Sequence, residues 1–74
     1  MSPKHKRFTA DEIVKILKNN NFKLTSQKGS HQKWKNHYTG NQVIVPFHKK
    51  SQQLPIGTIK SIIISSGIDK ENWK

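Results

Sequence analysis

The sequence contains no cysteine and only four acidic residues, Asp11, Glu12, Asp69 and Glu71. The lack of cysteine excludes disulfide bridges, thiolate metal ligands and cysteine nucleophiles. The acidic residues form two pairs that suit helix ends, and neither pair resembles the carboxylate cluster on which two-metal catalysis depends. We therefore expect no metal and no small-molecule cofactor.

Long hydrophobic runs are also missing. Hydrophobic residues make up 31% of the 74-residue chain and occur in separate clusters, none approaching the roughly 18–20 apolar residues that a membrane helix requires. The basic start, residues 1–7, is not followed by the apolar segment of a signal peptide. We expect a cytoplasmic protein with no membrane contact, in which a flexible basic arm (residues 1–8) precedes a single domain (residues 9–74).

Positive charge is abundant. The chain has 14 Lys and Arg residues and a formal net charge of +10, which indicates a nucleic acid or an acidic protein as partner. A membrane surface would favour basic residues along one face of an amphipathic helix, whereas here they are spread over the chain. All but Arg7 are lysines, which make sequence-tolerant phosphate contacts, while base reading in duplex DNA relies on arginine.

Helix signals occur near both ends of the chain. Thr9 and Glu12 have the spacing of a capping box, apolar residues then recur at helical spacing, and the asparagines at 19–21 end this first helix. Pro55 suits the first turn of a second helix, and Gly67 suits its C-cap.

Between the helices, residues 22–27, 30–36 and 43–47 alternate between apolar and polar side chains, as half-buried strands do. The predicted fold is therefore α+β, in the order α-β-β-β-α, with two helices packed on one face of a three-stranded antiparallel sheet. In the second strand, alternation places Trp34 on the core side and His31, Lys33 and Lys35 on the outer side.

The histidines are the remaining candidates for catalysis. His5 lies in the predicted arm and His37 in a predicted loop, so we interpret both as ordinary solvated residues. A lone histidine on a basic strand, such as His31, is more often an inert surface residue than a catalyst.

The expected strand register adds to the case for His31. If Thr39 and Gly40 form a two-residue hairpin loop, Trp34 faces Val45 on the core side and His31 faces His48 on the outer side. Two imidazoles on a lysine-rich face suit metal-independent cleavage of RNA. One removes the proton from a 2′-hydroxyl, an acid protonates the leaving 5′-oxygen, and nearby lysines stabilise charge on the phosphate. Histidine suits this chemistry because it titrates near neutral pH.

Four motifs resemble the HicA toxin family: Gly29-Ser30-His31, the aromatic Trp34, Val45-Pro46-Phe47-His48 and the Pro-Ile-Gly-Thr-Ile-Lys-Ser-Ile segment at residues 55–62. The resemblance extends over roughly residues 9–68. It implies a double-stranded-RNA-binding-like fold, ribosome-independent cleavage of messenger RNA by a catalytic His31, and neutralisation by a HicB-type antitoxin. One departure is Asn21, where the family usually has glycine, and asparagine tolerates the left-handed conformation expected there.

The prediction is thus an endoribonuclease toxin of a type II toxin–antitoxin system that acts on single-stranded RNA. His48 is a second catalytic candidate, with a structural or phosphate-contacting role as the alternative. The side chains expected to bind RNA are Lys28, Ser30, Lys33, Lys35, Lys49 and Lys50. A non-catalytic RNA-binding module of the double-stranded-RNA-binding type is the alternative function, and a basic ribosome-associated protein is a third. Tyr38 is a candidate for base stacking, with a plain surface tyrosine as its alternative.

Overall fold

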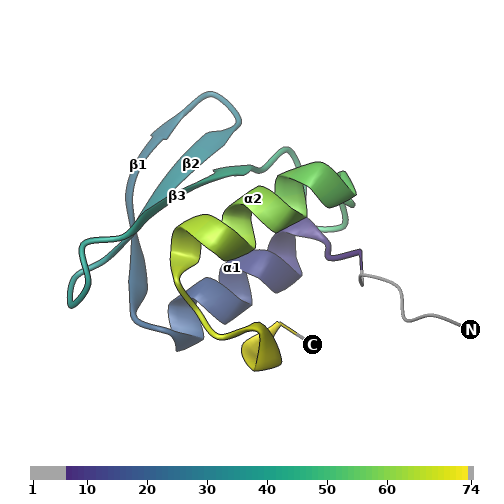
Figure 1. Ribbon diagram of the computed structural model, residues 1–74. Coiled ribbons are helices and arrows are strands. Elements are labelled where there is room, and N and C mark those ends of the chain that lie inside the picture. The colour runs from purple at the N-terminus through teal and green to yellow at the C-terminus, as the bar shows by residue number, and fades with distance from the viewer. Residues whose placement is uncertain (1–6, 74) are drawn as a thin grey trace, which may run out of the picture.

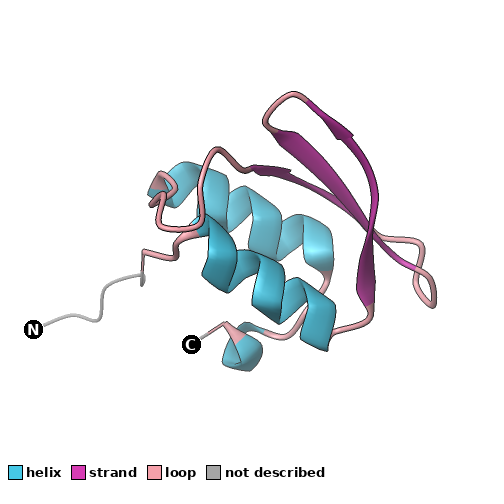
Figure 2. Cartoon of the chain, turned by 180° about the vertical axis from the view of Figure 1, so that it is seen from behind, coloured by secondary structure: helices cyan, strands magenta, loops and turns pink. Residues whose placement is uncertain are grey.

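The computed structural model describes residues 7–73, so the first six residues of the predicted arm lie outside the described part of the chain. Two helices cover one face of a three-stranded sheet and leave the other face open (Figures 1 and 2). The strands are antiparallel and lie in the order β1-β2-β3. The elements are α1 (Ala10–Asn19), β1 (Phe22–Lys28), β2 (His31–Asn36), β3 (Gln42–Pro46), α2 (Ile56–Ser66) and a final 3-10 turn, η1 (Lys70–Asn72). This is the α-β-β-β-α fold that the sequence predicts.

The capping box at the start of α1 is confirmed. The Glu12 amide donates to Thr9 Oγ1 (3.2 Å), and the Thr9 amide donates to Glu12 Oε1 (2.9 Å), so both side chains satisfy amides that a helix start leaves free. The helix buries Ile13 and Leu17 completely. Just beyond its end, Asn21 adopts a left-handed conformation with φ 72°, which turns the chain into β1.

The core lies between the sheet and the helices, and it begins earlier in the chain than the sequence predicts. Phe8 is only 2% exposed, and its ring packs edge-on against Trp73, with centroids 5.9 Å apart. The Leu54 amide also donates to the Phe8 carbonyl (3.2 Å). The predicted end of a flexible arm at residue 8 is therefore wrong, because burying this ring outweighs the basic character of the residues before it. The buried apolar side chains are Phe8, Ala10, Ile13, Val14, Leu17, Phe22, Trp34, Val43, Val45, Leu54, Ile59, Ile62 and Trp73.

The second helix ends as predicted. Gly67 is the C-cap of α2 and has φ 69°, a left-handed conformation that glycine adopts without steric cost. Any Cβ atom at this position would collide with the side chain of Asn41, whose Nδ2 donates to the Ser66 carbonyl (3.2 Å). This contact attaches the residue just before β3 to the end of α2. No helix in residues 7–73 is long and apolar enough to cross a membrane.

The register of β2 and β3 differs from the prediction. Trp34 lies opposite Val43, and His31 lies opposite Pro46. The expected pairs of Trp34 with Val45 and of His31 with His48 are therefore wrong. The shift is two residues, so it leaves every side chain on its predicted face of the sheet.

The cause of this shift is the length of the β2–β3 loop, which comprises residues 37–40. The Asn36 amide donates to the Asn41 carbonyl (2.9 Å), which closes the loop. Inside it, Asn36 Oδ1 accepts hydrogen bonds from the amides of Tyr38 (2.8 Å) and Thr39 (3.2 Å). The Asn36 side chain thus stabilises a four-residue loop, and Thr39 and Gly40 do not form a two-residue turn.

Candidate nucleic-acid interface

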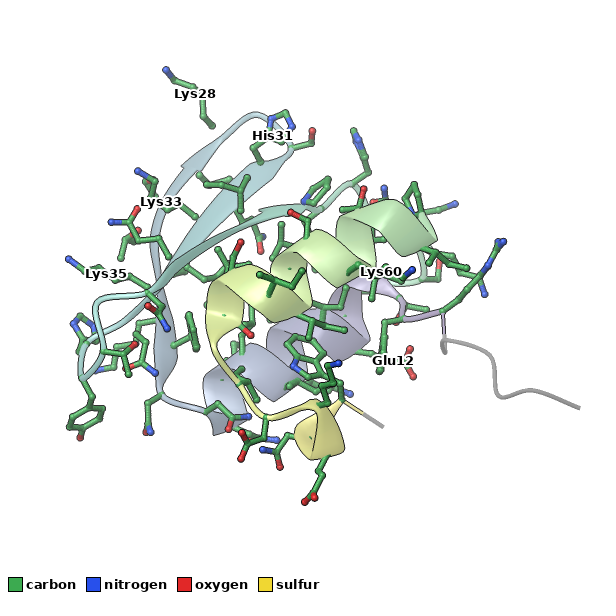
Figure 3. All side chains as sticks on the ribbon, in the orientation of Figure 1. Glu12, Lys28, His31, Lys33, Lys35 and Lys60 are labelled. Atoms are coloured by element: carbon green, nitrogen blue, oxygen red, sulfur yellow. The ribbon has the colours of Figure 1, made fainter. Side chains whose placement is uncertain are left out.

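The open face of the sheet carries five basic side chains, which we call the lysine face: Lys23, Lys28, His31, Lys33 and Lys35. In the strand register, Lys28 lies beside His31, and Lys23 lies beside Lys35. Figure 3 shows Lys28, Lys33 and Lys35 projecting from the sheet away from the helices, with His31 at the tip of the β1–β2 hairpin. The prediction that His31, Lys33 and Lys35 share the outer face is confirmed, since they alternate with the buried Trp34.

A tight turn fixes the position of His31. Gly29 has φ 59°, and its carbonyl accepts a hydrogen bond from Gln27 Nε2 (3.1 Å). The Ser30 carbonyl accepts from the Phe47 amide (2.6 Å), so the turn is joined to the chain that leaves β3. The imidazole of His31 is exposed, and within residues 7–73 it has no hydrogen-bond partner. It is therefore free to contact a ligand from solvent.

A β-bulge in β1 brings Lys28 onto the same face. Leu24 pairs with Trp34, but Ser26 pairs with Lys33, so Thr25 is the extra residue. Its hydroxyl donates to the Lys33 carbonyl (3.2 Å). Without the bulge, simple alternation from Leu24 would place Lys28 on the opposite face from His31.

The strands that form this face contain no acidic side chain that could offset its charge. Residues 13–68 contain no Asp or Glu, and the Lys15–Asp11 ion pair (3.3 Å) belongs to α1. Lys23 and Lys35 lie directly opposite each other, an arrangement of like charges that destabilises a sheet. A bound polyanion would remove this repulsion, so the electrostatics of the face favour phosphate groups.

The other predicted site residues follow β3 in an exposed loop. His48, Lys49 and Lys50 are all exposed, and the His48 amide donates to Gln52 Oε1 (2.8 Å). The Lys50 carbonyl accepts from the Asp11 amide (3.2 Å), which ties the loop to the start of α1. Because β3 ends opposite His31, this loop lies at the His31 end of the sheet, although His48 does not form the expected cross-strand pair.

Trp34 and Lys23 are the two residues of the sheet whose roles the sequence left open or missed. Trp34 is a core residue, since it is 4% exposed and its indole N–H donates to Gln32 Oε1 (3.1 Å). Lys23 was missed as a site residue, although its position next to the inward-facing Phe22 was a signal that it points outward.

Within residues 7–73, no three His, Asp or Glu side chains gather as metal ligands would.

The fold and the lysine face define a small, basic α+β protein whose open sheet surface is suited to a polyanion. Residues 10–68 match the family model of the HicA toxins of bacterial toxin–antitoxin systems, and the chain belongs to this family. The matched segment runs from the start of α1 to just beyond α2 and includes the whole lysine face. No curated protein matches the chain.

Proposed function

We propose that this chain is the toxin of a type II toxin–antitoxin system, a metal-independent endoribonuclease that cleaves messenger RNA with His31 as catalytic residue. One observation carries the proposal: an exposed imidazole lies beside Lys28, and on the same face as Lys33, on a surface without acidic side chains. Membership of a toxin family supports an activity that harms the cell.

In this proposal His31 acts as a general base toward single-stranded RNA. Its imidazole accepts the proton of a 2′-hydroxyl, whose oxygen attacks the adjacent phosphorus. The bond from phosphorus to the 5′-oxygen then breaks, and that oxygen takes up a proton from an acid. The products are a 2′,3′-cyclic phosphate and a 5′-hydroxyl. DNA lacks the attacking hydroxyl and is not cleaved.

The lysines of the face supply charge stabilisation in this reaction. Lys28 is the cross-strand neighbour of His31, a relationship that places Cβ atoms about 5 Å apart. Lys33 lies two residues along the same strand face, about 7 Å away. Both ammonium groups are thus placed to stabilise negative charge that develops on the phosphate. Ser30, Lys35, Lys49 and Lys50 would bind the neighbouring nucleotides.

His48 is our candidate for protonating the leaving oxygen. It belongs to the loop after β3, beyond the Pro46 that faces His31, so it would reach the phosphate from the loop and not from the sheet. His48→Ala should lower the cleavage rate by about 100-fold or more if it is the general acid. An effect on RNA affinity alone would instead assign it to phosphate contact.

The decisive experiment compares wild type with His31→Ala on single-stranded RNA in excess chelator. We expect cleavage by wild type only, with 2′,3′-cyclic phosphate or 3′-phosphate ends. His31→Ala should still bind an uncleavable 2′-O-methyl RNA, which separates catalysis from binding. Lys60→Ala is the control for loss of one charge, because Lys60 lies on α2 (Figure 3). Cleavage by His31→Ala would overturn the proposal.

A second function has its own support. The Lys23–Lys35 pair lies at the far end of the sheet from His31 and would serve RNA binding alone. If neither wild type nor His31→Ala cleaves RNA and both bind it, the chain is a non-catalytic RNA-binding module.

We also propose a HicB-type antitoxin as protein partner, one that covers the lysine face and prevents RNA from reaching His31. Excess antitoxin should then displace labelled uncleavable RNA from the toxin. The protein complex should survive moderate salt that disrupts RNA binding, because a packed interface depends less on charge. A ternary complex with RNA still bound would contradict this arrangement.

A further inference from the structure

The β2–β3 loop presents an aromatic ring to solvent. Tyr38 is 84% exposed, more than Leu24, Ile44 or Ile64, the other large hydrophobic side chains at the surface of the described chain. Aromatic residues make up only 8% of the sequence, and both tryptophans are buried. Tyr38 therefore contributes almost nothing to the core, and its placement calls for a different explanation.

The backbone that carries this ring is firmly held. The Asn36 side chain, 7% exposed, accepts from the Tyr38 amide and donates to the Asn20 carbonyl at the end of α1 (3.1 Å). The Gly40 amide donates to the Asn36 carbonyl (2.8 Å). A ring on a fixed backbone loses little conformational freedom when a ligand stacks on it.

A shallow pocket adjoins the ring. It has a volume of about 270 Å³ and is lined by Asn21, Lys23, His37 and Tyr38. We call it the Tyr38 pocket. It combines a phenol ring and an imidazole, which can stack on a base, with the Lys23 ammonium of the lysine face, which can bind a phosphate.

We propose that the Tyr38 pocket is a base-stacking subsite for single-stranded RNA bound along the lysine face. His31 and Asn36 are the two ends of β2, about 17 Å apart at ordinary strand rise. This length corresponds to about five nucleotides when measured as rise along a duplex axis, and to fewer in an extended single strand. Lys33 and Lys35 lie between the two sites on the same strand.

The assignment of RNA depends on the proposed function, but binding at the pocket does not depend on catalysis. RNA is favoured over an acidic protein segment because the pocket joins two flat rings to a row of lysines. The subsite predicts that the enzyme holds a strand by a base several nucleotides from the cleaved bond. An RNA that is bound at His31 and is too short to reach the Tyr38 pocket therefore lacks the stacking contact.

The test measures binding of uncleavable 2′-O-methyl RNA by fluorescence anisotropy. Tyr38→Ala should weaken binding of a decanucleotide about tenfold. Tyr38→Phe should restore tight binding, because it keeps the stacking ring. The matched control is Ile64→Ala, which removes another exposed side chain (80%) from α2, and it should not alter RNA affinity.

The outcomes separate this subsite from the proposed function. Unchanged decanucleotide binding by Tyr38→Ala overturns the subsite. If Tyr38→Phe loses as much decanucleotide affinity as Tyr38→Ala, the hydroxyl and not the ring is responsible, and the subsite is overturned as well. Loss of affinity for the antitoxin without loss for RNA would assign the pocket to a protein. If His31→Ala still cleaves RNA while Tyr38→Ala weakens decanucleotide binding, the catalytic proposal fails and the subsite stands.

Discussion

Lys23 of β1 and Lys35 of β2 lie directly opposite each other on the open face of the sheet. Neither has an acidic side chain nearby on the strands, because residues 13–68 contain no Asp or Glu. The pair therefore weakens the folded protein while concentrating positive charge where we propose that RNA binds. Stability and function oppose each other at this point of the surface.

The first prediction follows from this opposition. Lys23→Gln should stabilise the protein by about 0.2–1 kcal/mol at low salt, and the gain should shrink in high salt because the repulsion is screened. The same variant should bind RNA more weakly. Urea denaturation and RNA binding at two salt concentrations measure both effects. Lys60→Gln serves as control, and equal stability changes in the two variants would show that general net charge is responsible.

The second prediction concerns the salt dependence of RNA binding. Each phosphate neutralised on single-stranded RNA contributes about 0.7 to the slope of log affinity against log salt. Lys33→Gln should reduce the slope by about that amount, and Lys60→Ala should leave it unchanged. Affinities measured over a salt series for uncleavable RNA give both slopes. An unchanged slope for Lys33→Gln would exclude this side chain from phosphate contact.

The third prediction concerns Asn36, the buried side chain that organises the β2–β3 loop. Asn36→Ala leaves the Asn20 carbonyl and the amides of Tyr38 and Thr39 without this partner. It should cost about 1–3 kcal/mol of unfolding free energy, measured by urea denaturation. The exposed Asn19→Ala is the matched control and should change stability by less than about 0.5 kcal/mol. Equal effects of the two substitutions would contradict the role of Asn36.

The fourth prediction concerns the start of the fold. Phe8→Ala removes a ring that packs on Trp73 in the core and should destabilise the protein by about 3–5 kcal/mol. Such a loss is a large part of the stability of a domain of this size, so the variant should melt at a much lower temperature. Arg7→Ala, at the exposed neighbouring position, should have little effect. If Phe8→Ala were as stable as wild type, Phe8 would not be part of the core, and the predicted flexible arm would include residue 8.

Local chemistry allowed much of the fold to be predicted. Thr9 and Glu12 indicate the start of α1, Gly67 marks the end of α2, and alternation places Trp34 inward and His31 outward. Each of these depends on neighbours within a few residues in the sequence.

The errors arise where one side chain changes the geometry of a longer segment. A two-residue shift in register preserves alternation, so the sequence pattern does not distinguish His31 facing Pro46 from His31 facing His48. The Asn36 side chain decides between them through the loop. The bulge at Thr25 is equally invisible to alternation, although it brings Lys28 to the side of His31.

That bulge also affects how other proteins can attach to the sheet. Both outer strands have unpaired backbone groups, which in many proteins accept a strand from a partner. Here β1 is bent by the bulge and lined with lysines, and β3 is only five residues long and ends in Pro46, features that discourage such pairing. Neither edge is a good template for another strand, so association that extends the sheet, including aggregation between copies, is disfavoured. An inhibitor must then recognise side chains, and its specificity can change through surface substitutions that leave the fold intact.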